Sequence, residues 1–169
     1  MENTLRNPQF ALEPAELLHF FLSHLNRIYC AKSELIEKLP LLEERAFFLD
    51  LRHAVRETID AVCMQIIRMK EIYIKLDAVY QSESCIGLTG ILDEAFQSVG
   101  GPNDSAALRD LSILFYMQNI ESIEMSSFKV LMRVADGLQQ PAVAQLLAEC
   151  FDEAQEDKAL FRAITDNYL

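Results

Sequence analysis

Hydrophobic residues recur along the chain at the three- and four-residue spacing of amphipathic helices, in segments that prolines and glycines separate. The first segment predicts a helix from about Pro14, which suits a first-turn position, to just before Pro40. The second predicts a helix from near Leu42 to about Tyr80, because no Gly or Pro follows until Gly87. Helices of this length indicate a helical bundle.

The second half of the chain predicts one short helix and two long ones. The expected bounds are residues 91–99 for the short helix, from a cap at Asp104 or Ser105 to about Asp136 for the next, and from Pro141 to about Thr165 for the last. The sequence GGPND at residues 100–104 marks a clear break after the short helix. Gly137 is expected to supply the left-handed residue that ends the third long helix.

The lengths of the links between these helices indicate how the bundle is connected. The links after the first and third long helices are short, so each of those pairs should be an antiparallel hairpin. The middle link is long enough to cross the bundle and contains the short helix. The sequence therefore predicts an all-α, ferritin-like four-helix bundle with a short fifth helix in the long crossover. We expect one domain, residues 14–169, after an N-terminal extension of residues 1–13.

Each long helix carries an apolar stripe that polar residues interrupt. The interrupting residues are Lys32 in the first helix, Thr58 and Gln65 in the second, Glu121 in the third, and Glu153 and Asp157 in the fourth. Antiparallel helices can bring these six side chains to similar heights, where they would form a polar layer in the core. An unpaired buried carboxylate is costly, so a metal ion, another cation or proton uptake must neutralise such a layer.

Three interpretations of this layer are open. In the first, Lys32 centres a network of salt bridges and hydrogen bonds that satisfies itself. In the second, Glu121, Glu153 and Asp157 bind a metal ion. In the third, the assumed helical phase is wrong, and the polar residues lie on an exposed face.

The three histidines weaken the metal interpretation. A di-iron bundle takes a Glu from each of two helices and a Glu-x-x-His pair from each of the other two. His19, His24 and His53 complete no such pair, so we expect partly exposed helix residues at these positions. No Ser/His/Asp or Cys/His arrangement and no glycine-rich phosphate loop is present, so we predict no catalytic residue.

Charge and composition narrow the choice of partners and compartment. The 15 Lys and Arg against 26 Asp and Glu give a net charge of −11, which argues against nucleic acid as a partner. No long uncharged apolar run and no signal peptide is visible, so we expect a cytoplasmic protein without a membrane partner. Cys30, Cys63, Cys85 and Cys150 form no CxxC pair, and we expect them to be reduced core residues.

The third long helix carries a second apolar stripe. Its members are Ile113, Tyr116, Ile120, Ile123, Val130 and Val134. One bundle core can cover only one face of a helix well, so this stripe predicts either a homodimer interface or a surface that packs under the crossover helix.

Four segments of the chain carry motifs in the order and spacing of one known family. They are LNRIYCAKSELIEKLP at residues 25–40, CIGLTGILDE at 85–94, NIESIEMSSF at 119–128 and LLAECFDEAQED at 146–157. Over about residues 16–165 the chain resembles the bacterial YciE/YciF-like proteins, a ferritin-like domain of unknown function. The resemblance implies a ferritin-like dimer linked to stress responses, with a possible dinuclear metal centre of iron or manganese.

The chain departs from this family where the family's motifs carry acids and histidines. The departures are Lys32 in place of a glutamate, Thr58 and Gln65 where histidines would stand, and Ser122 in place of another histidine. The matching acids are Glu121, Glu124 and Glu153, with Asp157 near the family's last acid. The resemblance therefore implies a degraded ligand set, in which Lys32 takes the place of the metal as an internal cation.

These observations support one hypothesis and two alternatives. The hypothesis is a stress-associated, homodimeric structural or interaction protein of unknown biochemical activity, with no cofactor and no identifiable small-molecule substrate. The first alternative is a di-iron or di-manganese oxidase or peroxidase that retains metal through Glu121, Glu124, Glu153 and Asp157. The second is a binding module whose acidic outer faces recruit a basic partner.

Overall fold

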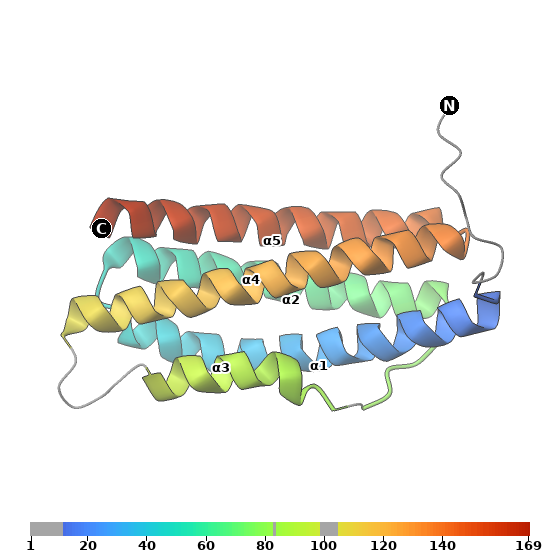
Figure 1. The fold of residues 1–169 in the computed structure, drawn as a ribbon, viewed down its shortest axis with the longest axis horizontal. Coiled ribbons are helices and arrows are strands. Elements are labelled where there is room, and N and C mark those ends of the chain that lie inside the picture. Colours follow the sequence, from blue (N-terminus) through green and yellow to red (C-terminus); the bar gives the residue numbers. More distant parts are fainter. Residues whose placement is uncertain (1–11, 83, 99–104) are drawn as a thin grey trace.

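Five α-helices make up the part of the chain that the computed structural model describes, residues 12–82, 84–98 and 105–169. They are α1 (Pro14–Arg45), α2 (Leu49–Lys75), α3 (Ile86–Ser98), α4 (Ala106–Gly137) and α5 (Pro141–Tyr168) (Figure 1). Residues 1–11 of the expected N-terminal extension and the expected break at 100–104 lie outside the described residues. Among the described helices, none combines the length and apolar composition of a membrane span.

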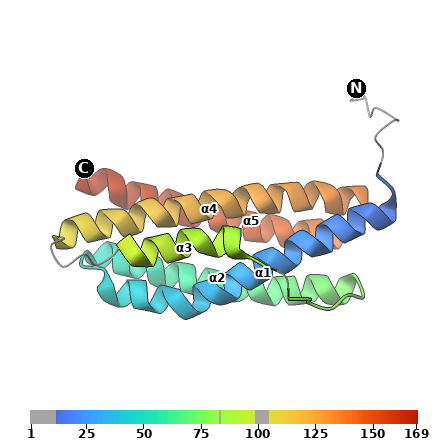
Figure 2. The same cartoon turned by 60° about the horizontal axis from the view of Figure 1, so that its bottom comes forward.

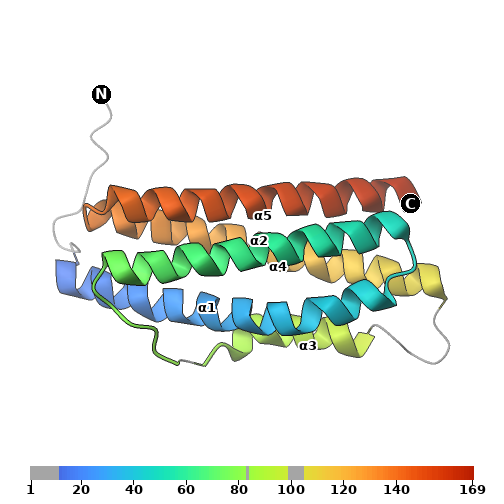
Figure 3. The ribbon, with the colours of Figure 1, turned by 180° about the vertical axis from the view of Figure 1, so that it is seen from behind.

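The four long helices form two antiparallel hairpins, α1 with α2 and α4 with α5, which pack side by side (Figures 1 and 3). Contacts between the hairpins join α2 to α5 and α1 to α4. The connection from α2 to α4 returns along the bundle, and α3 lies on the outside against α1 and α4 (Figure 2). The predicted all-α bundle, with ferritin-like connectivity and a short helix in its crossover, is confirmed.

Helix α1 continues through Pro40 to Arg45, so the prediction that it ends before this proline was wrong. A proline inside a helix costs about 3 kcal/mol, because it removes a backbone hydrogen bond and crowds the preceding turn. Leu39 and Leu42 are nevertheless fully buried on either side of it, and Ala46 continues the same buried face. Burial of this continued stripe outweighs the cost of the proline.

Helix α2 begins at Leu49 and not near Leu42, and a residue from another helix binds the backbone of the two residues just before it. The fully buried carboxylate of Asp110, on α4, accepts hydrogen bonds from the backbone N–H of Phe47 (2.8 and 3.0 Å) and of Phe48 (2.6 Å). Its negative charge also complements the dipole of α2 at this end. Asp110 therefore joins the turn between α1 and α2 to the second hairpin.

The ends of the crossover differ from the prediction in both directions. Helix α2 stops at Lys75, before the predicted end at Tyr80, and Asp77 then adopts a positive φ of 50°. A left-handed residue of this kind ends the helical path. Helix α3 begins earlier than the predicted residues 91–99, at Ile86.

The bounds of the second hairpin lie closer to the prediction. The Ser105 side chain accepts a hydrogen bond from the backbone N–H of Leu108 at 3.2 Å, so Ser105 is the N-cap of α4. Gly137 remains inside α4, and Gln139 takes the left-handed conformation with a φ of 57°, which corrects the prediction for Gly137. Helix α5 continues past the predicted end to Tyr168.

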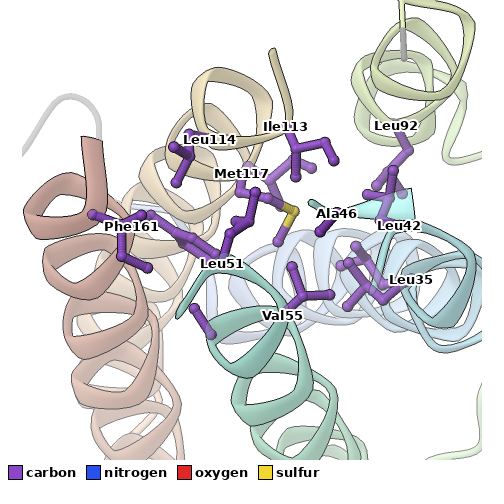
Figure 4. Close-up of a cluster of buried hydrophobic side chains, with 14 of the residues drawn as sticks. Leu35, Leu42, Ala46, Leu51, Val55, Leu92, Ile113, Leu114, Met117 and Phe161 are labelled. Atoms are coloured by element: carbon purple, nitrogen blue, oxygen red, sulfur yellow. The ribbon is translucent and has the colours of Figure 1, made fainter. Parts of the chain in front are cut away.

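Buried apolar side chains form two clusters, one toward each end of the bundle. Figure 4 shows the first cluster, in which Leu51 of α2, Met117 of α4 and Phe161 of α5 meet side chains from α1 and α3. The second cluster surrounds Phe21 and Phe128 and uses the opposite ends of the long helices. The two clusters leave between them the part of the interior where the polar residues lie.

The cysteines differ from the expected set of reduced core residues. Cys30 of α1 and Cys85, just before α3, form a disulfide across 55 residues of sequence. Cys63 is exposed, and Cys150 alone is a buried thiol, whose pKa burial raises to about 12. Because the paired cysteines lie far apart in the sequence, their spacing carried no sign of the pairing.

Candidate functional site

A belt of polar side chains crosses the interior between the two apolar clusters. The polar belt consists of Lys32 from α1, Thr58 and Gln65 from α2, Glu121 and Glu124 from α4, and Asp157 from α5, each at most 8% exposed. Five of these residues are the predicted members of the polar layer, and Glu124 was predicted only as a metal ligand. All four long helices of the bundle contribute to the belt.

Lys32 supplies the positive charge of the polar belt. Its side chain is fully buried, and its Nζ forms an ion pair and hydrogen bond with Oε2 of Glu124. The same ammonium lies 5.7 Å from the centroid of the Phe128 ring, within the range of a cation–π contact. A buried ammonium without partners would be very costly, and these two contacts offset that cost.

Glu121 lies one turn before Glu124 on the same inner face of α4. Burial raises the pKa of Glu121 well above its usual range, and the charge of Glu124 raises it further. The Lys32 ammonium opposes these effects, while the charge of Asp157 and a hydrogen bond with Glu124 add to them. Glu121 is thereby disposed to hold a proton that a solvent-exposed glutamic acid would have lost at the same pH.

Asp157 approaches the polar belt from α5. Burial raises its pKa to about 6, against the lowering effects of the Thr58 hydroxyl and the Lys32 ammonium. The charges of Glu124 and Glu153 raise it further. Three inward-facing acids thus share one ammonium, and two of them bind a proton more readily than exposed carboxylates do.

The two α2 residues leave the polar belt incompletely bonded. Gln65 donates from Nε2 to the backbone oxygen of Cys150 at 3.4 Å, but its Oε1 has no hydrogen-bond partner among the described residues. The Thr58 hydroxyl also lacks a partner there, since it faces Asp157 without reaching hydrogen-bond geometry. Buried polar atoms without partners cost free energy, so the belt is a destabilising element within an apolar core.

Glu153 lies at the flank of the bundle and not in the polar belt. Its carboxylate accepts from Nη1 of Arg68 at 2.9 Å, and Arg68 Nε also donates to Glu149 at 2.9 Å. The buried stripe of α5 passes through Ala154 and Asp157, so Glu153 is turned by about 100° from the center of that stripe. Its predicted place in the layer was wrong by one residue of helical phase.

The residues of the polar belt do not fit a dinuclear metal centre. The Lys32 ammonium already pairs with the Glu124 carboxylate, and Glu153 pairs with Arg68. In residues 12–82, 84–98 and 105–169, no group of three or more His, Cys, Asp or Glu side chains is placed to hold a metal ion. The ligands predicted for the metal alternative are Glu121, Glu124, Glu153 and Asp157.

Comparison with known proteins places this bundle in a family. The model of the family described as "Domain of unknown function (DUF892)" matches residues 16–168, nearly the whole chain. The chain belongs to the DUF892 family. A comparison with curated proteins finds no match.

Two solved structures have the same fold as this DUF892 chain. The Escherichia coli stress protein YciF superposes with a TM-score of 0.85 at 20% identity, covering 90% of this chain and 96% of YciF. YcfI from Rhodopseudomonas palustris superposes with a TM-score of 0.82 at 20% identity, covering 94% of this chain and 98% of YcfI. At this identity the likeness shows a shared ferritin-like fold.

The remaining positions singled out in the sequence lie outside the polar belt of this DUF892 chain. Ser122 donates its hydroxyl hydrogen to the Gln118 carbonyl oxygen at 2.6 Å within α4. His19 and His53 are exposed. His24 is half-buried, with its ring 4.3 Å from that of Phe20, and lines a surface groove.

This groove has a volume of about 880 Å³ and runs between α1, α3 and α4 of the DUF892 chain. It divides the second apolar stripe of α4 into two parts. Ile113 and Ile120 are buried in the core cluster that includes Leu92 of α3, as expected for packing under the crossover. Ile123 lines the groove, and Val130 is 51% exposed at its edge.

Proposed function

We propose that this DUF892 chain is a metal-independent bundle in which Lys32 balances the charge of the buried acids. We also propose that it is a cytoplasmic, stress-associated protein with a structural or interaction role. The buried ion pair between Lys32 and Glu124 carries this proposal. The association with stress is extended to this chain from the stress protein YciF, whose fold it shares.

Electrostatics makes Lys32 and a metal ion alternatives to one another. A divalent ion bound to Glu121 and Glu124 would stand next to an ammonium that the surrounding protein shields from water. Like charges at such short range repel by several kcal/mol at the effective dielectric constant of a protein, about 20. Proton binding by Glu121 and Asp157, whose pKa values burial raises, lowers the remaining negative charge without any metal.

Metal analysis of purified protein tests this proposal. We expect wild-type protein from cells supplemented with iron or manganese to contain far less than one metal ion per chain. Chelation with EDTA should leave its denaturation midpoint unchanged. Lys32→Glu restores the acid that the family resemblance implies, and we expect this variant to be destabilised and to recover stability when Mn²⁺ or Fe²⁺ is added.

Lys70→Glu is the matched control, because it makes the same charge change at an exposed position on α2. This control should show no stabilisation by Mn²⁺ or Fe²⁺. Wild-type protein with about one or more metal ions per chain, lost on Glu121→Ala, would contradict the proposal and favour the oxidase or peroxidase alternative.

We also propose that two copies of the chain associate through the outer face of α4. All acids of this helix up to residue 135, Asp110, Glu121 and Glu124, are buried. The outer face presents the exposed side chains Phe115 and Val130 and no acid before Asp136. In a chain of net charge −11, a face without acids is the one on which two copies meet with least repulsion.

The order of residues on this face suits two-fold pairing. If two α4 helices pack antiparallel and centred between Ser122 and Ile123, Phe115 of each copy lies opposite Val130 of the other. Asn119 then lies opposite Ser126. A two-fold interface uses the same patch on both copies. This order of residues places the large side chains Phe115 and Val130 opposite each other at both ends of the interface, with the smaller Asn119 and Ser126 between them.

Size-exclusion chromatography with light scattering tests the dimer. At micromolar concentration we expect wild-type protein to have twice the mass of one chain, and Phe115→Glu to have the mass of one chain. Ile74→Glu places the same charge at another exposed apolar position, on α2, and should remain dimeric. A monomeric wild type, or dissociation by Ile74→Glu and not by Phe115→Glu, would overturn the α4 interface.

A further inference from the structure

The crossover helix α3 covers a point at which the polar belt comes close to the outside. Beneath α3 lies a small cavity of about 20 Å³, roughly the space that one water molecule needs. Glu124 and Ser127 of α4 are the polar residues of its lining, and Ile91 and Leu92 of α3 close it from outside (Figure 2 shows α3 over α1 and α4). The cavity therefore lies between α3 and the Lys32–Glu124 pair.

Only a few side chains separate this cavity from the large groove. Both hollows are lined by Ile28 of α1, Ile91 of α3, and Ile123 and Ser127 of α4. A displacement of Ile91 together with α3 would open a path from the groove to the Glu124 carboxylate. The burial of the ion pair thus depends on the position of one short helix.

A disulfide fastens the leading end of α3. Cys85 directly precedes α3, and its partner Cys30 lies two residues before Lys32 on α1. The Cys85 carbonyl oxygen accepts hydrogen bonds from the backbone N–H and the hydroxyl of Thr89, at 3.0 and 3.3 Å. The first turn of α3 is thus built on Cys85, so the disulfide holds that turn against α1.

Few of the described side chains at this end of α3 are buried. Ile86 is 76% exposed, and a Cβ at Gly87 or Gly90 would meet nothing within 4 Å. Glycines also lower the helix propensity of the segment by about 1 kcal/mol each relative to alanine. The buried apolar side chains described for α3, Leu92 and Ala95, lie at and beyond its midpoint, and Thr89 is the buried side chain described nearer its start. A helix end with few buried contacts opens locally at small cost once its covalent tie is removed.

We infer that Cys30 and Cys85 form a thiol–disulfide exchange site through which dithiol reductants release the leading end of α3 and expose the Lys32–Glu124 pair to water. A thiolate of the reductant attacks one sulfur of the disulfide and forms a mixed disulfide, while the other cysteine leaves as a thiolate and takes up a proton. The second thiolate of the reductant then displaces the remaining cysteine. The protein gains two electrons and two protons, and the reductant becomes a disulfide. Cys30 and Cys85 are both partly exposed, as this attack requires.

The redox state of the compartment then determines whether the first turn of α3 is held against α1. On the cytoplasmic location proposed above, cellular thiols keep such a pair reduced, and the disulfide-bonded form belongs to oxidising conditions. The exchange chemistry itself is a property of the purified chain. The test of the disulfide measures neither metal content nor oligomeric state. A failure of this inference can therefore be told apart from a failure of the proposed metal-independent function or of the proposed dimer.

Thiol counting with hydrogen exchange tests the inference. After the folded protein has been treated with oxidised dithiothreitol and then denatured, it should show two reactive thiols, those of Cys63 and Cys150, and reduced dithiothreitol should raise the count to four. In folded protein, reduction should speed amide exchange in residues 86–91 at least tenfold and leave α5 unchanged. Reductive methylation of Lys32, read by mass spectrometry against exposed Lys70, should accelerate by a similar factor.

Two variants separate the disulfide from general effects of the reductant. Cys30→Ser/Cys85→Ser should exchange and methylate as the reduced wild type does, with or without dithiothreitol, whereas Cys63→Ser should respond as the wild type does. Should the double variant fail to fold, the wild type measured with and without reductant decides alone. Four thiols after treatment with oxidised dithiothreitol, or equal exchange and methylation in the oxidised and reduced states, would overturn the inference.

Discussion

Replacing Lys32 by methionine should lower the free energy of unfolding by about 3–5 kcal/mol, the cost of leaving one partner of a buried ion pair without the other. Methionine keeps much of the volume of the lysine side chain, so the substitution leaves little cavity. The loss of stability therefore measures the cost of leaving the buried Glu124 carboxylate without its partner. Urea denaturation at pH 7 measures this change, with the slope compared between variants to verify that unfolding remains two-state.

A double-mutant cycle separates the pair from its surroundings. Lys32→Met/Glu124→Gln removes both charges and should recover at least half of the loss caused by Lys32→Met. Lys38→Met is the control, because Lys38 pairs with Asp93 at 2.6 Å and with Glu34 at 3.2 Å while partly exposed. That change should cost less than about 1 kcal/mol. A loss at Lys32 no larger than at Lys38 would show that the buried pair does not balance the polar belt.

Asp157→Asn should make the protein more stable than the wild type above neutral pH, by up to ~3 kcal/mol. The pKa of Asp157 rises on folding from 3.8 to about 6, and each unit is worth about 1.4 kcal/mol. The folded state therefore binds this proton more tightly, and wild-type stability falls as the pH rises from about 4 through 6. Asparagine resembles the protonated acid, so the variant lacks this loss.

Thermal or urea denaturation at several pH values measures the difference between variant and wild type. The difference should be small near pH 4 and reach its full size by about pH 7.5. Asp152→Asn removes an exposed carboxylate from the same helix and should stay within about 0.5 kcal/mol of the wild type throughout. A difference for Asp157→Asn that is equal at pH 4 and pH 8 would contradict the raised pKa.

Much of the fold follows from the sequence because helix periodicity and link length are local signals. The long segments between breakers became α1, α2, α4 and α5, and the long link became the crossover with α3. The errors lie where tertiary packing outweighs a local rule. Pro40 is a strong helix breaker in isolation, but buried Leu39 and Leu42 hold it inside α1.

The candidate site could be predicted only as far as helical phase could be read. Lys32 and Asp157 interrupt clear apolar stripes, and both lie in the polar belt. On α4 and α5 the stripes are broad, and an error of one residue turns a side chain by about 100°. This error put Glu153 in the predicted layer and left out Glu124, which lies in the belt.

Contacts between distant segments were beyond the reach of these signals. Asp110 lies one turn before Leu114 on the buried face of α4, so extending the stripe backward would have marked it as buried. No local feature of the sequence shows that its carboxylate binds the backbone at the start of α2. The pairing of Cys30 with Cys85 likewise depends on where the crossover passes α1.

The cap that Asp110 provides makes the two hairpins dependent on each other for folding. The backbone N–H groups of Phe47 and of Phe48, the N-cap of α2, are bonded by a carboxylate that lies 63 residues from Phe47 in sequence, so the start of α2 gains its full stability only after α4 has docked. The first hairpin alone would fray at its own turn. Long-range contacts of this kind raise the contact order, so we expect them to slow folding and the link between α1 and α2 to become ordered late.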